Sequence, residues 1–132
     1  MSKQLRSSAT ILLVEDDEEI RDDMKHFLEN QGYHVALAFD ENDSLRLISN
    51  SNLEIRLILI NQRMLSDEAL AVGRRIREHE SVADSAPVVV IPFEFTKDLE
   101  GTNQSIGNGD YKSYIANGQQ LEELLLQLLP TN

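Results

Sequence analysis

Residues 11–21 read ILLVEDDEEIR, so four apolar residues run directly into five consecutive acidic ones. A continuous apolar run of this length is typical of a strand that is buried on both faces, as in the centre of a parallel sheet. The next apolar residues, Ile20, Met24, Phe27 and Leu28, have helical spacing, and Gly32 follows as a stop signal. The stretch therefore predicts a buried strand, an acidic turn and an amphipathic helix over residues 17–30.

The same pairing of a strand with a helix recurs along the chain. We expect further strands at residues 34–38, 57–60, 88–91 and 111–115, and helices after Asp40, around residues 69–76 and over residues 121–129. Residues 96–109 have a weak helical pattern that Gly101 interrupts, which predicts a short or distorted fourth helix. The sequence thus predicts an α/β domain with a parallel sheet over residues 9–130, preceded by a flexible tail at residues 1–8.

Composition limits the classes of function. The 132 residues include 12 Lys and Arg and 23 Asp and Glu, which gives a net charge of −11 and argues against direct nucleic-acid binding. The absence of cysteine excludes structural disulfides and thiolate metal sites. The apolar runs are too short to span a bilayer, and residues 1–10 lack the apolar centre of a signal peptide. We therefore expect a cytoplasmic domain that makes no membrane contact.

The acidic turn has two interpretations. Asp17, Glu18 and Glu19 suit the start of a helix, where backbone N–H groups and the macrodipole favour negative charge. Glu15 and Asp16 instead end a buried strand, where ligands collect in parallel sheets, and their carboxylates are of the type that holds Mg²⁺. We expect at most a weak magnesium site at Glu15 and Asp16 and no other cofactor.

The chain resembles a response-regulator receiver domain over residues 9–130. The resemblance rests on ILLVEDDEEIR, on Tyr33 before the second strand, on RRIR at residues 74–77 and on Pro87 before the fourth strand. It implies a flavodoxin-like (βα)5 sandwich with strand order 2-1-3-4-5. In that family an aspartate that ends the third strand accepts a phosphoryl group from a histidine kinase, with magnesium bridging the acid pair and the phosphoryl oxygens.

This chain departs from the family at the residues that handle phosphate. Asn61 stands at the phosphoacceptor position, and an amide cannot form the acyl phosphate. In the family, a hydroxyl residue that ends the fourth strand contacts the phosphoryl group and serves as one position of a switch. Pro92 stands at that position here, and Tyr111 stands at the second position of the switch. Tyr114 stands where the family has a lysine on the fifth strand. Lys112 would be that lysine only if the strand register were shifted. The resemblance therefore implies a pseudo-receiver, which is not an enzyme and acts in two-component signalling by protein association.

Apolar residues near the end of the chain indicate a surface for a partner. Phe93, Phe95 and Leu126 border the face of the fourth helix, fifth strand and fifth helix, through which receivers associate. We expect a signalling protein or a second copy to bind there. Three alternatives stay open: phosphotransfer through an unusual acceptor such as Asp17, a small ligand such as a flavin or quinone at the strand ends, and structural packing in a larger assembly.

Two smaller expectations concern charged residues on the third helix. Arg74, Arg75 and Arg77 should form exposed pairs on the helix surface with nearby glutamates of the same segment. Asp67 should cap the amino terminus of this helix.

Overall fold

The computed structural model describes residues 9–94 and 96–129 and contains one sheet of six strands. The strands are β1 (Thr10–Glu15), β2 (His34–Ala38), β3 (Ile55–Asn61), β4 (Val88–Val90), β5 (Asn103–Gly107) and β6 (Asp110–Ser113). Their order is β2-β1-β3-β4-β6-β5, and every neighbouring pair is parallel except β5 with β6. The expected α/β class and the order of the parallel strands are confirmed.

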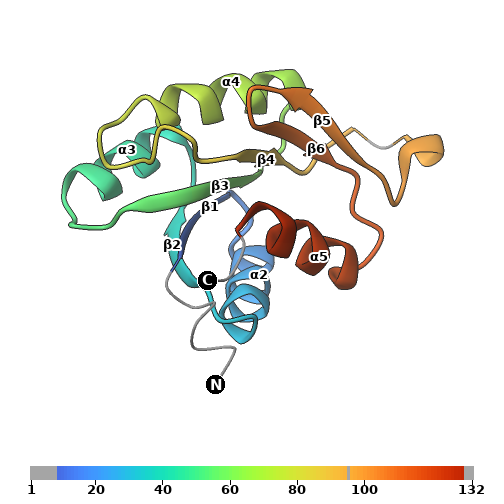
Figure 1. Cartoon of the computed structure of the whole chain (residues 1–132), viewed down its shortest axis with the longest axis horizontal. Helices are drawn as coiled ribbons and strands as arrows, with labels where there is room; N and C mark the ends of the chain where they lie inside the picture. The colour runs from blue at the N-terminus through green and yellow to red at the C-terminus, as the bar shows by residue number, and fades with distance from the viewer. Residues whose placement is uncertain (1–8, 95, 130–132) are drawn as a thin grey trace.

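Helices cover both faces of the sheet (Figure 1). On one face lie α2 (Glu18–Asn30) and α5 (Gly118–Leu128), and on the other lie α3 (Glu41–Ser49) and α4 (Ser66–Arg77). Asp17 and Asp40 cap α2 and α3 with their side chains, in line with the sequence pattern. Among the described residues, no helix is long and apolar enough to cross a membrane.

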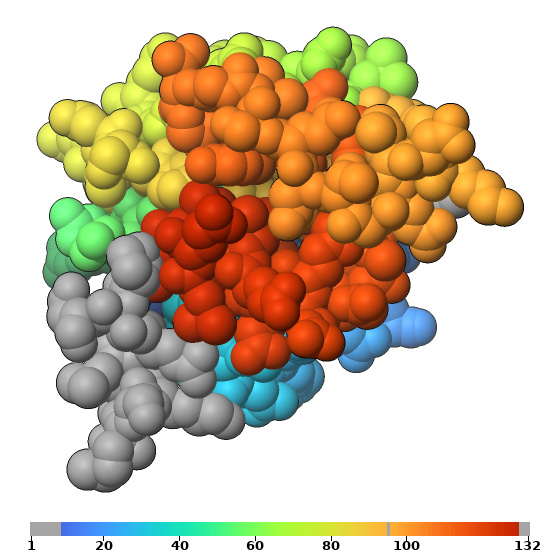
Figure 2. Space-filling model, turned by 45° about the vertical axis from the view of Figure 1, so that its right-hand side comes forward, coloured from blue at the N-terminus to red at the C-terminus, as the bar shows by residue number. Residues whose placement is uncertain are grey.

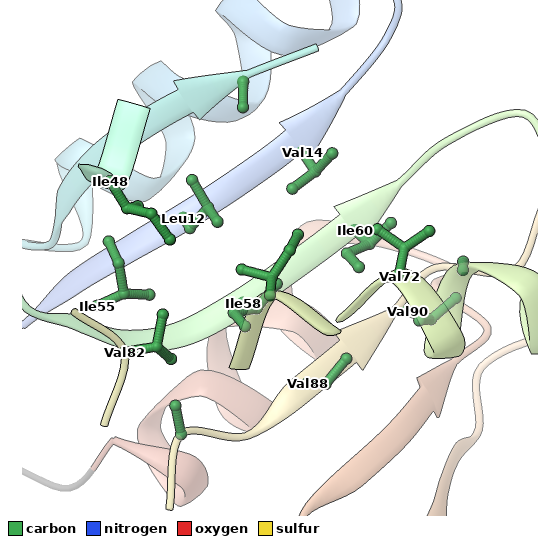
Figure 3. Close-up of a cluster of buried hydrophobic side chains, with 14 of the residues drawn as sticks. Leu12, Val14, Ile48, Ile55, Ile58, Ile60, Val72, Val82, Val88 and Val90 are labelled. Atoms are coloured by element: carbon green, nitrogen blue, oxygen red, sulfur yellow. The ribbon is translucent and has the colours of Figure 1, made fainter. Parts of the chain in front are cut away.

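Strands β1 and β3 are buried on both faces because each side of the sheet carries its own apolar core. Alternate residues of a strand point to opposite faces, so Leu12 and Val14 join the core under α3 and α4, while Ile11 and Leu13 join the core under α2 and α5. Figure 3 shows Ile48 beside β1, and Val72 beside Ile60 and Val90. This arrangement explains the continuous apolar runs.

The expected fourth helix is absent from the described residues 96–109, which form a different structure. A single 3₁₀ turn (Lys97–Leu99) leads into β5, which pairs with β6 in an antiparallel hairpin. Gly107, Asn108 and Gly109 all have positive φ values, which glycine and asparagine adopt at low cost in a tight turn. The expected strand at residues 111–115 begins one residue earlier, at Asp110, and ends at Ser113.

A buried carboxylate attaches this hairpin to α4. Asp110 is fully buried, and its two oxygens accept hydrogen bonds from Arg74 Nε at 2.7 Å and Arg77 Nη1 at 2.8 Å. Arg75 pairs with Glu41 on α3. The expected exposed pairs within the α4 segment were therefore wrong, because tertiary packing brings acids of other elements closer to these arginines.

Candidate functional site

The candidate site lies at the carboxyl edge of the sheet, where β1 and β3 end. Glu15 and Asn61 are register partners across these two strands, and the Asn61 amide Nδ2 donates a hydrogen bond to Glu15 Oε1. Asn61 Nδ2 also lies 3.8 Å from Met24 Sδ of α2. The position that the receiver resemblance assigns to the phosphoacceptor thus directly contacts the first residue of the acid pair.

Burial controls the protonation of Glu15, which is only 2% exposed. Loss of solvent raises the pKa of the Glu15 carboxyl above its ordinary value of 4.5. Hydrogen bonds from the Asp17 backbone N–H and from Asn61 oppose this shift because both favour the carboxylate. A second carboxylate at position 61 would remove one of these donors and add a like charge.

The remaining acids of the turn also have partners within the protein. The Asp16 carboxylate accepts from the Arg63 backbone N–H at 3.2 Å and lies 4.0 Å from Arg63 Nε. Asp17 Oδ1 caps α2 by accepting from the N–H groups of Glu19 and Ile20, each at 3.0 Å. In residues 9–94 and 96–129, moreover, no three acidic or histidine side chains are grouped to hold a metal ion. Only these two carboxylates would contact a magnesium ion here, and each keeps acceptor capacity beyond its hydrogen bonds, so the weak magnesium site expected at Glu15 and Asp16 stays a prediction.

The other positions taken from the resemblance lie on the neighbouring strands. Pro92 and Tyr114 line the same small pocket, whereas Tyr111 is half-buried against the core under α2 and α5. Lys112 is the register partner of Val90, and its Nζ lies 2.9 Å from Asp67 Oδ1. Lys112 therefore pairs with α4, and the alternative that it replaces the missing lysine at the acid pair is not supported.

Sequence reasoning missed the role of Glu94. Its carboxylate accepts two hydrogen bonds from Ser66, from the backbone N–H at 3.1 Å and from Oγ at 2.6 Å. Leu65 occupies the N-cap position of α4 and has no capping side chain, so Glu94 supplies the cap from a distant loop. The expectation that Asp67 caps this helix was wrong. The signal available in the sequence was the apolar Leu65 at the N-cap position, because its side chain cannot accept a hydrogen bond and another residue must cap the helix.

Exposed apolar residues surround the carboxyl edge of the sheet. Phe93 is 58% exposed and lines a cleft with Ile20, Asn61 and the acidic turn. Leu65 and Phe39, which are also exposed, lie in the loops that follow β3 and β2. Leu126 is half-buried on α5, which adjoins the β5–β6 hairpin in Figure 2. Phe95 lies outside the described residues.

Comparisons with known proteins agree with this architecture. The family model described as response regulator receiver domain matches residues 11–125, and the chain therefore belongs to this family. It is 29% identical over 118 residues to Response regulator MprA of Mycobacterium sp. (strain KMS), covering 89% of this chain and 48% of the relative. MprA of Mycobacterium ulcerans (strain Agy99) is 27% identical over 121 residues, covering 92% of this chain and 49% of the relative. The chain spans about half the length of these curated relatives.

Solved structures confirm the flavodoxin-like fold. The chemotaxis response regulator CheY4 of Vibrio cholerae matches with a TM-score of 0.67 and 20% identity, covering 92% of this chain and 98% of that one. The receiver domain of sensor histidine kinase PA1611 from Pseudomonas aeruginosa PAO1 matches with a TM-score of 0.67 and 21% identity, covering 95% of this chain and 100% of that one. The chain is thus a receiver domain of the two-component response-regulator family, whose receiver domains are generally not enzymes.

Proposed function

We propose that this receiver domain acts as a protein-interaction module that is not phosphorylated. The observation that carries the proposal is the hydrogen bond from Asn61 to Glu15, because it places a neutral amide where the family uses an aspartate nucleophile. Pro92 and Tyr114 support it, since Pro92 lacks the hydroxyl and Tyr114 lacks the ammonium group that normally contact the phosphoryl oxygens. The proposed location is the cytoplasm, where a signalling partner would meet the domain.

The proposed docking face consists of the β5–β6 hairpin and α5, with Phe93 at its border. The hairpin takes the place of the expected fourth helix, and Gln120 of α5 donates to Asn103 of β5 at 2.9 Å, so the two elements form one continuous surface (Figure 2). Ile106 on β5 is 42% exposed, which adds apolar area. A signalling protein or a second copy of this chain is the proposed partner.

Treatment with a phosphodonor tests the first part of the proposal. Purified protein is incubated with acetyl phosphate and Mg²⁺, and its intact mass is measured beside a receiver that is known to be phosphorylated. We expect the mass to stay unchanged and beryllofluoride to leave the amide NMR shifts unchanged. A stoichiometric gain of one phosphoryl group would overturn the proposal, and its loss in Asp17→Asn would identify the alternative acceptor.

An apolar cleft favours a second candidate function, the binding of a small ligand such as a flavin or quinone. The cleft has a volume of about 320 Å³ and lies between α2 and α5, lined by Met24, Phe27, Asn61, Ile115 and Leu121 among others. Mostly apolar pockets of this size suit small aromatic ligands. Absorption spectra of the protein as purified test this function, because a bound flavin or quinone would absorb at wavelengths where the chain does not.

A further inference from the structure

Strand β5 forms the outer edge of the sheet, with β6 on one side and no further strand of the described chain on the other. The Tyr114 backbone N–H donates to the Thr102 carbonyl at 2.9 Å. Hydrogen-bonded pairs alternate along an antiparallel ladder, so the backbone groups of Thr102 and Gln104 point towards β6. The N–H and C=O groups of Asn103 and Ser105 therefore point away from the sheet, at the surface that the orange segment forms in Figure 2.

This edge has little protection against pairing with another strand. Natural edge strands are commonly protected by charged side chains, by proline, by bulges or by covering elements. Residues 101–109 contain no charged residue and no proline, and all residues of β5 except Gln104 are exposed. The bulge at Ile106 adjoins the turn and leaves residues 103–105 regular. The opposite edge strand, β2, is better covered, because only its first residue, His34, is exposed.

The outward edge of β5 is complementary to itself. In an antiparallel pair with a two-fold axis at Gln104, Asn103 of each copy lies opposite Ser105 of the other, and each such pair exchanges both N–H···O bonds. Gln104 then faces Gln104 of the second copy, and a side-chain amide both donates to and accepts from another amide. Residues 101–107 of the two copies face each other without any charge, although each chain carries a net charge of −11.

Asn103 gives this edge a side-chain donor of fixed orientation. The Ala116 backbone N–H donates to Gln120 Oε1 at 2.8 Å, so Gln120 Nε2 is the atom that donates to Asn103 Oδ1 at 2.9 Å. The Ser113 hydroxyl also donates to Asn103 Oδ1, at 2.6 Å. Both contacts use the oxygen, so Asn103 Nδ2 keeps two N–H donors without a partner in the described part of the chain. In the two-fold register, Ser105 Oγ of the second copy lies on the same face and can accept from Nδ2.

We infer that β5 pairs antiparallel with β5 of a second copy of this chain, with the two-fold axis at Gln104. This inference rests on the proposed docking face, of which β5 is the outer strand, and it assigns that strand to the second copy. A contact of two short strands is smaller than a standard interface, so the dimer is weak and depends on concentration. Because both copies are strongly acidic, their long-range repulsion opposes association, and added salt strengthens the dimer.

Disulfide cross-linking tests the register, since the chain contains no cysteine of its own. In the inferred dimer the two residues 104 form a non-hydrogen-bonded pair with Cα atoms about 4.5 Å apart, which is within the range for a disulfide. Gln104→Cys should therefore form a covalent dimer under mild oxidation. Gln127→Cys is the matched control, because it replaces an exposed glutamine of α5, and it should stay monomeric. Equal cross-linking of both variants, or of Gln127→Cys alone, would overturn the inference.

Sedimentation equilibrium of the full chain, up to millimolar concentration and at low and high salt, measures the association itself. Ser105→Pro removes an outward N–H from each copy and no hydrogen bond to β6, so it should weaken the dimer by about tenfold. Ser105→Ala keeps this N–H and should weaken the dimer less. Amide NMR spectra report whether the β5–β6 hairpin is intact; if Ser105→Pro disrupts it, the cross-linking of Gln104→Cys decides.

A chain that stays monomeric at every concentration would overturn the inference, as would a dimer that salt dissociates or that Ser105→Pro leaves unchanged with the hairpin intact. These results would not affect the proposed binding of a signalling protein, which variants of Phe93 and Leu126 test separately. Failure of the dimer and failure of the proposed function are therefore distinguishable.

Discussion

Asn61 and Glu15 face each other across β3 and β1, and the amide of Asn61 donates to the buried Glu15 carboxylate. The hydrogen bond joins a neutral amide donor to a carboxyl group that is almost completely buried. An aspartate in place of Asn61 would present a second acceptor to Glu15 and would bring a third carboxylate to Glu15 and Asp16. We therefore expect the identity of residue 61 to affect both phosphoryl chemistry and the stability of the fold.

The first prediction is that Asn61→Asp destabilises the domain at neutral pH in EDTA. Two like charges about 4 Å apart repel each other by about 1 kcal/mol in bulk water and by about 4 kcal/mol at a partly buried site, where the effective dielectric constant is lower. We therefore expect the free energy of unfolding to fall by about 1–4 kcal/mol. Urea unfolding measures it. Asn52→Asp is the control, because it introduces the same charge at an exposed loop residue. Equal stability of all three proteins would show that residue 61 does not interact with the acid pair.

The second prediction concerns the response of Asn61→Asp to pH and magnesium. The carboxyl pKa values of the cluster should rise, as burial already raises the pKa of Glu15. A carboxyl group whose pKa is raised on folding destabilises the folded state as the pH rises through that pKa. The difference in free energy of unfolding between Asn61→Asp and the wild type should therefore shrink as the pH falls. Magnesium should also restore stability by binding the folded variant, with little effect on the wild type. Unfolding curves at several pH values and Mg²⁺ concentrations test both effects; a deficit independent of both would contradict the electrostatic cause.

The third prediction is that Ser66→Ala weakens the fold through Glu94. The hydrogen bonds from Ser66 hold the pKa of the Glu94 carboxyl below its ordinary value of 4.5. A carboxyl group whose pKa is lowered on folding stabilises the folded state at pH values above its ordinary pKa. This stabilisation is lost as the pH falls through the lowered pKa. We expect Ser66→Ala to cost about 1–2 kcal/mol at pH 7 and less in acid, because it removes a charged hydrogen bond. Ser105→Ala, at an exposed residue of β5, should cost little at either pH.

The fourth prediction is that the β5–β6 hairpin depends on Asp110. Asp110→Ala removes a fully buried carboxylate that two arginines contact, so we expect a loss of about 2–4 kcal/mol. Arg77→Ala should cost more than Arg74→Ala, because the Arg77 side chain is 17% exposed against 47% and also donates to the Ala86 carbonyl. Urea unfolding and amide hydrogen exchange in the hairpin measure these effects. Hairpin exchange unchanged by Asp110→Ala would contradict the prediction.

The fifth prediction tests the proposed docking face. A partner is recovered with the wild-type chain as bait, identified and purified, and its affinity for variants is then titrated. Leu126→Gln and Phe93→Gln should each weaken binding by about tenfold, as expected when an apolar side chain that contacts the partner becomes polar. Leu65→Gln is the control, because Leu65 is also exposed but lies in the loop before α4. If only Leu65→Gln weakens binding, the partner docks beside the start of α4 instead of on the proposed face. Sedimentation of the chain alone reports self-association.

The sequence by itself determined the repeated strand–helix pattern, because burial on both faces of a sheet requires continuous apolar runs such as residues 11–14 and 57–60. It also placed Asn61 at the end of β3 beside Glu15, since parallel strands bring their carboxyl ends to one edge. These features follow from local pattern and simple topology.

Only the tertiary structure decided the conformation of residues 96–109 and the partners of the charged residues. The segment has only a weak helical pattern that Gly101 interrupts, and its pairing with β6 depends on an available sheet edge and on the turn at residues 107–109. Likewise, Asp110 is far in sequence from Arg74 and Arg77, and Glu94 is far from Ser66. Many carboxylates of this acidic chain are chemically equivalent partners, and only packing decides which of them lies within hydrogen-bonding distance and is shielded from water.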